Sequence, residues 1–357
     1  MAANDVERAA LGWANLGGYA CAKPLTHSEQ KSVFDGAHQL GVRMHDTAID
    51  YGRGFAEEGL GLAWTAGQIP RDELRIQSKV LRRLVTPESG QQYREAGLWS
   101  CPEPYASRIT TWDWSYSGVL HQAAESRERL RIDYHNGLAL HDPAEAIREA
   151  GFRLVDLDAG ALAALRDLKQ QGRLREIGVG SKEIDVVLDL LRLYPRPFDY
   201  FMIMNYNLLD HHRCLDELIP ACQDHGVRLS LAGPYASGIL ASSTSEMNPF
   251  LYYKKADRDV VRKTELLVQL AREHGMNSLR PAAVQFVAAN STFSRIIFGG
   301  RTPTEIEENI GNLSSPIPAA FWQRLRETTV DGKPLIHPKA PLPEHQPLSP
   351  PWGREPG

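Results

Sequence analysis

Over most of its length the chain alternates between short apolar runs of strand length and longer amphipathic stretches of helical length. Such alternation is typical of parallel strands that are joined by helices. The predicted strands lie near 11–13 and at 42–46, 74–80, 138–141, 177–181, 200–204, 227–231 and 295–298. Eight strand–helix units in one chain favour an α/β fold of the (β/α)8 TIM-barrel type, folded as a single domain. The pattern alone leaves an open doubly wound sheet as the alternative.

Glycine marks the ends of several predicted helices, because it readily adopts the left-handed conformation that closes a helix. Gly41, Gly172, Gly226 and Gly275 each follow an amphipathic stretch. Pro303 lies in the first turn of the last predicted helix, where proline is favoured. The sequence therefore predicts helices at 27–40, 162–171, 214–225, 257–274 and 302–310.

Two segments do not follow the alternation. Residues 81–114 form a long loop after the third strand, and a connection of that length is usually functional or disordered. Residues 334–357 hold eight prolines, which cannot fit a helix or a central strand, so an extended tail is expected. We therefore predict a polar N-terminal segment at 1–10, a barrel domain at 11–330 and a proline-rich tail at 331–357.

Composition and charge argue against nucleic-acid binding, membrane insertion, secretion and cysteine-based sites. The net charge of −4 and the pI of about 6.3 give no basic surface for nucleic acid. No run approaches the ~18 apolar residues of a membrane span, and residues 1–8 lack the features of a secretory signal. The four cysteines are too scattered for a disulfide framework or a zinc site. A cytoplasmic protein with reduced thiols at Cys21, Cys101, Cys214 and Cys222 is expected.

Four polar residues follow three successive predicted strands, where the active sites of barrels lie. They are Asp46, Tyr51, Lys79 and His141. Free tyrosine titrates near ~10, and a lysine cation beside it favours the phenolate. A carboxylate would keep the lysine charged and oriented, and a histidine could hydrogen-bond a substrate oxygen. This set suits proton exchange with a carbonyl or hydroxyl group during hydride transfer.

Each of these residues also has a simpler interpretation. Asp46 could cap a turn, Lys79 could belong to a solvated basic face, and His141 could be an ordinary loop residue. Their occurrence at three successive strand ends favours the catalytic interpretation. No metal site is predicted, since the pair His211–His212 has no further ligand at useful spacing and is expected at the surface.

With these residues in view, the sequence resembles the aldo-keto reductase family from about residue 11 to residue 325. The motifs that carry the resemblance lie at 46–52, 78–80, 140–143, 177–181, 299–303 and 308–309. The resemblance implies a TIM barrel, a nicotinamide cofactor, and a catalytic tetrad of Asp46, Tyr51, Lys79 and His141. It further implies cofactor contacts at Ser181, Asn205, Ser237, Gly238, Gly299, Gly300, Arg301, Thr302, Glu305, Glu308 and Asn309.

The same resemblance bears on the choice between NAD and NADP. Members that prefer NADPH carry Lys-Ser and a later Arg around the 2′-phosphate. The corresponding residues in this chain are Gly299, Gly300 and Glu305. A carboxylate facing a phosphate is repulsive, although Arg301 could partly compensate. We therefore expect that NAD is slightly preferred.

A looser resemblance, on residues 112–118, 236–241 and 321–325, points to the branch that contains D-threo-aldose 1-dehydrogenase (L-fucose dehydrogenase) and pyridoxal 4-dehydrogenase. It implies a sugar or a similar polar aldehyde as substrate, converted from aldose to lactone or from aldehyde to alcohol.

Trp13, Trp112 and Trp114 could offer flat faces to a sugar ring, or could be packing anchors. A lower-ranked possibility is that Arg82, Arg83 and Arg108 bind an anionic substituent. A homo-oligomer is possible. The alternative function is a nucleotide-sensing binding subunit with little turnover, as in the potassium-channel β-subunits of this family.

Overall fold

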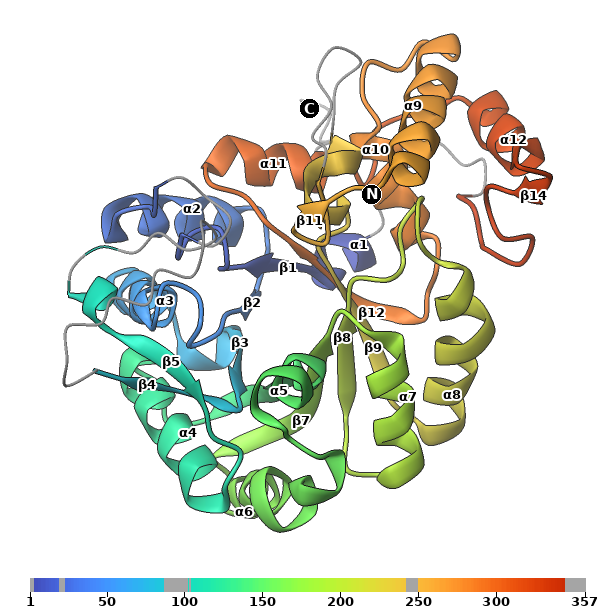
Figure 1. Cartoon of the computed structure of the whole chain (residues 1–357). Coiled ribbons are helices and arrows are strands. Elements are labelled where there is room, and N and C mark those ends of the chain that lie inside the picture. Colours follow the sequence, from blue (N-terminus) through green and yellow to red (C-terminus); the bar gives the residue numbers. More distant parts are fainter. Residues whose placement is uncertain (1–2, 19–22, 87–101, 103, 242–249, 344–357) are drawn as a thin grey trace.

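Eight parallel strands close into a barrel in the computed structural model, which describes residues 3–18, 23–86, 102, 104–241 and 250–343 (Figure 1). The barrel strands are β1 (Ala9–Gly12), β2 (Met44–Asp46), β3 (Arg75–Val80), β6 (His135–His141), β7 (Leu174–Ser181), β8 (Tyr200–Ile203), β9 (Arg228–Ala232) and β12 (Phe293–Phe298). They follow one another around the barrel in chain order, and β12 pairs with β1 to close it. The predicted TIM barrel is confirmed, and the open sheet is excluded.

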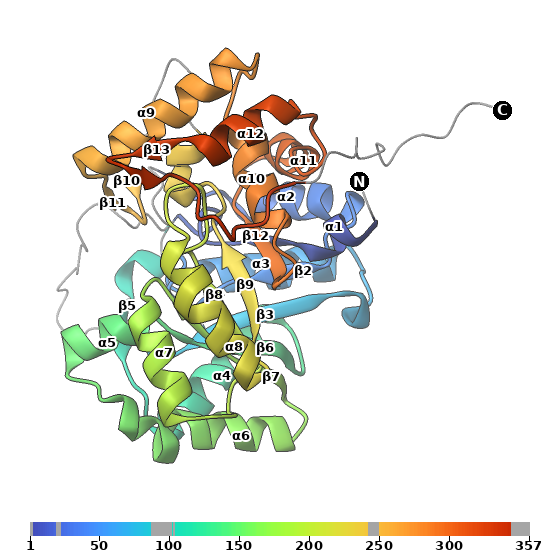
Figure 2. The same ribbon diagram turned by 90° about the vertical axis from the view of Figure 1, so that its right-hand side faces the viewer.

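Helices form a ring outside the strands (Figure 1), and Figure 2 shows the same arrangement from the side of the barrel. They are α2 (His27–Gln39), α3 (Phe55–Ala66), α4 (Tyr116–Leu130), α6 (Ala163–Gln170), α7 (Ile184–Leu193), α8 (Ile219–His225), α10 (Arg280–Ala288) and α11 (Pro303–Gly311). Additional helices are α1 (Ala3–Arg8), α5 (Pro143–Ala150), α9 (Arg258–Glu273) and α12 (Ala319–Glu327). Local signals fix their ends: Thr26 and Glu29 form a reciprocal capping box at α2, and Gly226 ends α8 in the left-handed conformation.

Two apolar regions hold the barrel together. The larger lies between the strands and the helices and contains residues such as Phe34, Leu165 and Phe286. The smaller lies among inward-facing side chains of the barrel and consists of Ala10, Met44, Met202 and Ile297. A layer of this kind makes the interior of the barrel a packed core rather than a channel.

Several strands begin earlier than the sequence pattern predicts. β6 begins at His135 rather than near 138, β7 at Leu174 rather than 177, and β12 at Phe293 rather than 295. The first residues of these strands include Asn136, Arg175 and Glu176, whose polarity hides them from a search for apolar runs. The carboxyl ends of the strands, which position the site, agree with prediction to within one residue.

The long loop after the third strand contains secondary structure of its own. Its antiparallel hairpin of β4 (Arg82–Val85) and β5 (Ile109–Trp112) is not predicted from the sequence pattern. Residues 87–101 and 103 lie outside the described residues, as do Cys21 and Cys101. Further two-stranded ribbons are β10 (Phe250–Leu251) with β11 (Lys254–Lys255), and β13 (Thr329–Val330) with β14 (Lys333–Pro334).

The first part of the predicted tail packs against the domain. Leu335, Ile336 and Ala340 are buried, and the Arg326 guanidinium of α12 donates to the carbonyls of His337 and Ala340. Residues 344–357 lie outside the described residues. None of the helices in the described ranges is both long and apolar enough for a membrane crossing.

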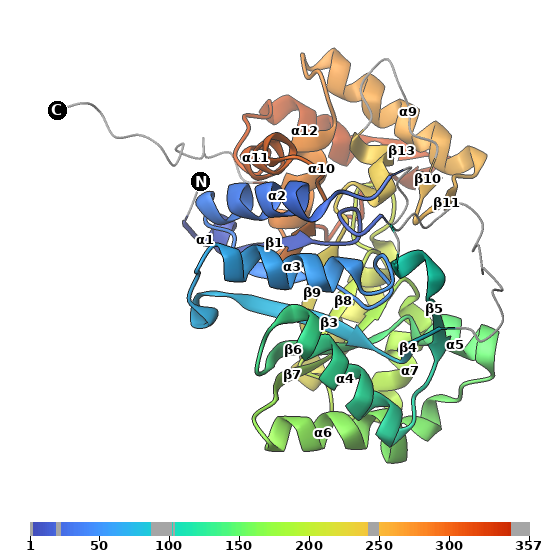
Figure 3. The same cartoon turned by 90° about the vertical axis from the view of Figure 1, so that its left-hand side faces the viewer.

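The two ends of the barrel carry different additions (Figure 3). The β4–β5 hairpin, α5 and the β10–β11 ribbon gather at the end where the strands finish, whereas α1 lies at the end where they begin. Arg8 anchors α1 there by donating to the carbonyls of Ala288, Asn290 and Phe293. The hairpin, α5 and the ribbon therefore lie at the end at which barrel enzymes place their active sites.

Candidate active site

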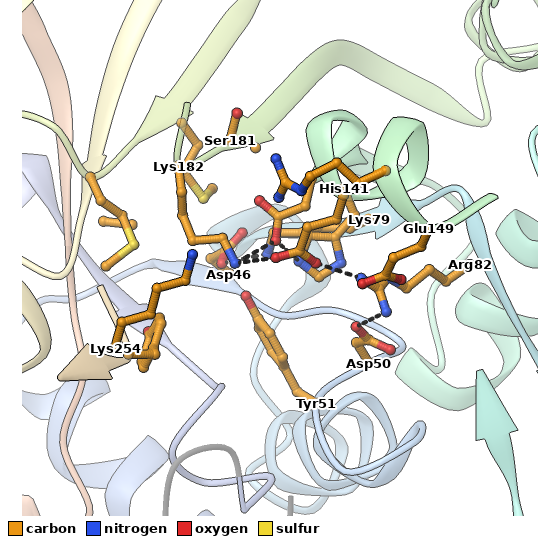
Figure 4. Close-up of a pocket in the computed structure, with 18 residues that line it drawn as sticks. Asp46, Asp50, Tyr51, Lys79, Arg82, His141, Glu149, Ser181, Lys182 and Lys254 are labelled. Atoms are coloured by element: carbon orange, nitrogen blue, oxygen red, sulfur yellow. Dashed lines mark hydrogen bonds and ion pairs between the residues drawn. The ribbon is translucent and has the colours of Figure 1, made fainter. Parts of the chain in front are cut away.

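A cavity of about 520 Å³ lies at the carboxyl ends of the barrel strands (Figure 4). Asp46 at the end of β2, Lys79 in β3 and His141 at the end of β6 line it, together with Tyr51 from the loop after β2. The four residues of the predicted tetrad therefore converge on one space. They do so because parallel strands bring their carboxyl ends to one mouth of the barrel.

The Lys79 ammonium is held between two oxygens. It lies 2.8 Å from the Asp46 carboxylate and 2.9 Å from the Thr47 carbonyl oxygen, in a buried environment. The same nitrogen lies 4.8 Å from the centroid of the Tyr51 ring. Burial raises the pKa of Asp46, and the Lys79 cation opposes that shift. The pair thus places a positive charge beside the phenol of Tyr51.

His141 faces the same cavity as an uncharged ring. Burial lowers its pKa well below the usual value, and the cations of Lys79, Arg82 and Lys182 lower it further. Its ring meets Tyr51 edge to face, with centroids 5.9 Å apart. A neutral imidazole carries one N–H that can be donated to a substrate oxygen.

Next to the tetrad lies a chain of ion pairs, which we call the rim network: Asp50, Arg82, Asp142, Glu145 and Lys182. Arg82 lies 3.2 Å from Asp50 and 2.8 Å from Glu145. Lys182 lies 2.7 Å from Glu145 and 3.2 Å from Asp142. Asp142 in turn lies 3.9 Å from His141 Nε2, so the network reaches the tetrad.

The rim network contains residues that the sequence analysis did not predict as functional, namely Asp50, Asp142, Glu145 and Lys182. Burial raises the pKa of Asp142 to about 6, with Lys182 lowering it and Glu145 raising it. All four of these residues stand within four positions of a predicted catalytic residue or directly after a strand, and that proximity was the available signal.

Two predicted cofactor residues follow β7 and β8. Ser181 lines the cavity, and its hydroxyl bonds to the backbone of Glu183. Asn205 donates to Asp210, but its side-chain oxygen is buried with no hydrogen-bond partner. An acceptor in that state fits an amide N–H of a ligand. Tyr206, the next residue in the chain, stacks on Phe286 in the core.

The predicted pyrophosphate segment follows β9. Ser237 and Gly238 both adopt left-handed backbone conformations, with φ of 62° and 94°. The Ser237 hydroxyl accepts from the backbone N–H of Tyr253, which ties the turn to the β10–β11 ribbon. This unusual backbone conformation at a strand end is typical of functional sites.

The remaining predicted cofactor residues surround the start of α11. Thr302 caps the helix by accepting from the Glu305 N–H, and Glu305 accepts from the Arg301 N–H. The Arg301 guanidinium is held by the carbonyls of Asn15 and Lys23. Asn309 donates inward to the Gly299 carbonyl.

Glu308 is exposed and pairs with Arg280. Gly300 lies against Ile306, where a Cβ atom would come within 2.4 Å. The unpartnered Asn205 oxygen, the left-handed turn at 237–238 and the capped start of α11 fit a dinucleotide. The described residues contain no group of side chains that could hold a metal ion.

The predicted substrate tryptophans lie elsewhere. Trp13 is fully buried, and its indole donates to His45, so it is a core residue and not part of the cavity wall. Trp114 packs on Phe152. Trp112 stacks on the Arg82 guanidinium at 3.9 Å and borders an adjoining cavity of about 340 Å³. These tryptophans serve mainly as packing anchors, because large aromatic rings are stabilised by burial.

Three further expectations can be compared with the structure. Arg83 pairs with Asp113, and Arg108 lies over the Tyr105 ring, so neither arginine lines the main cavity. His211 is buried rather than at the surface, and its two ring nitrogens contact the Asn207 carbonyl and the His337 N–H. Burial lowers its pKa to about 3, so it is a neutral packing residue.

Comparisons with known proteins agree with this geometry. The family described as "Aldo/keto reductase family" matches residues 9–329. D-threo-aldose 1-dehydrogenase from a Pseudomonas species is 30% identical over 89% of this chain and 93% of its own length. Pyridoxal 4-dehydrogenase from Microbacterium luteolum is 28% identical over 88% of this chain and 92% of its own length. The structure of an aldo-keto reductase from Bacillus halodurans superposes with a TM-score of 0.66 at 21% identity and covers 96% of this chain and 95% of that protein.

Proposed function

The chain belongs to the aldo/keto reductase family, and on that premise we propose that it is an NAD(P)-dependent oxidoreductase of a sugar or similar polar aldehyde. The observation that carries the proposal is the convergence of Asp46, Tyr51, Lys79 and His141 on one cavity. The nicotinamide ring, when bound, supplies or accepts a hydride at the carbon that carries the substrate oxygen. Ser181, Asn205, Ser237, Gly238 and the segment 299–309 would hold the cofactor.

The tetrad divides the proton chemistry among its members. Tyr51 gives a proton to the substrate oxygen in reduction and takes it in oxidation. The Lys79 cation favours the phenolate of Tyr51, and so brings the two protonation states of that group closer in energy. Asp46 holds Lys79 in place. His141, being neutral, donates its N–H to the substrate oxygen and orients it without giving up a full proton.

The cavity wall suits a neutral polyhydroxy substrate. Its ionic side chains comprise five cations and five carboxylates, so no charge is in excess. They are Lys79, Arg82, Arg148, Lys182, Lys254, Asp46, Asp50, Asp142, Glu145 and Glu149. Sugar hydroxyls can both donate to carboxylates and accept from cations. The names of the two relatives, an aldose dehydrogenase and a pyridoxal dehydrogenase, support the same class of substrate.

We propose a preference for NAD. The Glu305 carboxylate stands in the first turn of α11 beside Arg301, whose guanidinium is already engaged with backbone carbonyls. A 2′-phosphate there would meet a negative charge and would have to recruit Arg301 from its present partners. The test compares kcat/KM for NAD and NADP, and a tenfold advantage for NADP would contradict the preference.

The function is tested by a screen of aldoses, pyridoxal and sugar aldehydes with both cofactors, followed by NAD(P)H absorbance. Tyr51→Phe should then reduce turnover of the best substrate by about 10²–10⁴-fold and leave cofactor binding unchanged. Tyr116→Phe is the matched control, since that hydroxyl bonds Asp167 on the outer helices. If the wild type binds NAD(P)H but turns over no member of the panel, the nucleotide-sensing alternative replaces this proposal.

A further inference from the structure

A second polar cavity lies at the opposite end of the barrel, where the strands begin. It has a volume of about 280 Å³ and is lined by residues of β2, β3, β6, β7, β8, β9 and β12. Met44 lines this cavity and Met202 lines the catalytic one, and both belong to the apolar cluster inside the barrel. The cluster therefore separates the two spaces, and the second cavity does not belong to the site described above.

Arginines surround the second cavity in excess over carboxylates. Arg75, Arg175, Arg228 and Arg295 line it, whereas the acidic residues in its wall are Asp72 and Glu176. Arg228 is paired with Glu176 at 2.8 Å. Among the described residues, no carboxylate lies within ion-pair distance of the other three arginines. The wall thus carries two positive charges more than negative ones.

The three unpaired arginines differ in exposure: Arg75 and Arg175 are exposed at the mouth of the cavity, whereas Arg295 is half-buried. Arg295 is half-buried and donates to the Ser294 carbonyl, and Arg175 lies over the Tyr134 ring at 4.8 Å. Burial lowers the pKa of Arg295, and Arg75 and Arg228 lower it further, while Glu176 and Glu7 oppose them. Gathering like charges in this way is unfavourable unless an anion is bound.

The floor of the cavity holds polar atoms that lack partners. Tyr200 and Gln77 are almost fully buried and line the cavity, yet the Tyr200 hydroxyl and the Gln77 side-chain oxygen make no hydrogen bond. The Tyr200 ring can lie there only because Gly137 and Gly178 have no side chain, since a Cβ at either would come within 2.8 Å of it. Buried polar groups without partners cost stability, so their retention at a cavity indicates a ligand or bound water.

We propose that this cavity, at the amino ends of the barrel strands, is a binding site for a phosphoryl group, either inorganic phosphate or a small phosphomonoester. Arg75, Arg175 and Arg295 would bind the phosphoryl oxygens, because guanidinium groups match the geometry of that anion. The Tyr200 hydroxyl would donate to the ligand from the floor. The volume exceeds that of one phosphate ion, which leaves room for a short organic group.

Titration calorimetry of the full chain in a phosphate-free buffer tests the proposal with inorganic phosphate as the probe. We expect saturable binding of one phosphate per chain, at least about tenfold weaker in Arg75→Gln and in Arg295→Gln. Arg192→Gln removes the same charge from the outer surface, where Arg192 pairs with Asp189, and should leave the affinity unchanged. Thermal unfolding of each variant establishes that it is folded.

Two further binding measurements identify which phosphate compound the cavity takes and whether the anion binds there or in the nucleotide site. Glycerol 3-phosphate binding more tightly than inorganic phosphate would identify a phosphomonoester, whereas equal affinities would identify the phosphoryl group alone. Glycerol should not bind. The proposal is overturned if the wild type shows no saturable binding, or if the arginine variants bind as the wild type does. It is equally overturned if saturating NAD displaces the phosphate, because the anion would then occupy the nucleotide site.

Discussion

The two ends of the barrel arrange their charged residues in opposite ways. At the carboxyl ends of the strands, cations and carboxylates are equal in number and linked by ion pairs such as Lys79–Asp46 and Arg82–Glu145. At the amino ends, arginines outnumber carboxylates and three of them have no acidic partner among the described residues. Pairing fixes the protonation state of each group, which suits proton chemistry, whereas an unpaired excess of one sign suits the binding of an anion.

Replacing a cation at each end should give the largest contrast. Lys79→Met removes the charge that favours the Tyr51 phenolate, and kcat should fall by about 10²–10⁴-fold. Arg295→Gln should change kcat less than about twofold, because the apolar cluster separates it from the catalytic cavity. Steady-state kinetics of both variants with the same substrate measures the contrast.

The Lys79 variant also needs a control for stability. Removing the lysine leaves Asp46 buried without its partner, which typically costs about 3–5 kcal/mol. The double variant Asp46→Asn/Lys79→Met should recover most of the unfolding free energy but none of the activity. Recovery of turnover in the double variant would show that the loss came from misfolding and not from missing proton chemistry.

A smaller effect is expected at the rim network. The pKa of Asp142 is raised to about 6, so its ionised form dominates above that pH and favours the tautomer of His141 with the proton on Nε2. Activity should therefore rise with pH through this region. Lys182→Met removes a cation 3.2 Å from Asp142, which should move the inflection upward by about one pH unit.

The pH profile of kcat/KM measures that shift. Arg148→Met is the matched control, because Arg148 lines the same cavity but pairs with Glu183 and not with Asp142. An inflection that stays in place in Lys182→Met would show that Asp142 does not govern the profile.

The free energy of unfolding should depend on pH in the opposite direction to activity. Because folding raises the pKa of the Asp142 carboxyl, the protein becomes less stable as pH rises from about 4 to about 6.

The sequence was sufficient to predict the barrel and the convergence of Asp46, Tyr51, Lys79 and His141 on one cavity, because both depend on patterns that are local. Apolar runs predict strands, and Asp46, Lys79 and His141 stand at or next to their ends. The rim network was not predicted, since Arg82 and Glu145 are far apart in the chain and meet only once β3 and β6 are paired. The β4–β5 hairpin was missed for a related reason: its β4 strand begins with two arginines and resembles a solvated loop.

Aromatic residues were the least predictable part of the site. Trp13 follows a strand, as a substrate residue would, but its side chain points into the core and donates to His45. Nothing in the sequence distinguishes those two directions, because an indole suits a sugar platform and a packed core equally well. The polar arginine cavity went unnoticed because its residues are spread over seven strands and show no local motif.

The smallest expected effect concerns the floor of the arginine cavity. The Tyr200 hydroxyl is buried and has no partner, so Tyr200→Phe should be neutral or should stabilise the ligand-free protein by up to about 1 kcal/mol. Phosphate should then stabilise the wild type more than the variant, because the wild type alone can donate that hydroxyl to the anion. Urea unfolding with and without phosphate measures both differences. A variant that is markedly less stable without phosphate would show that the hydroxyl already has a bound-water partner, and the contrast between the two ends of the barrel would weaken accordingly.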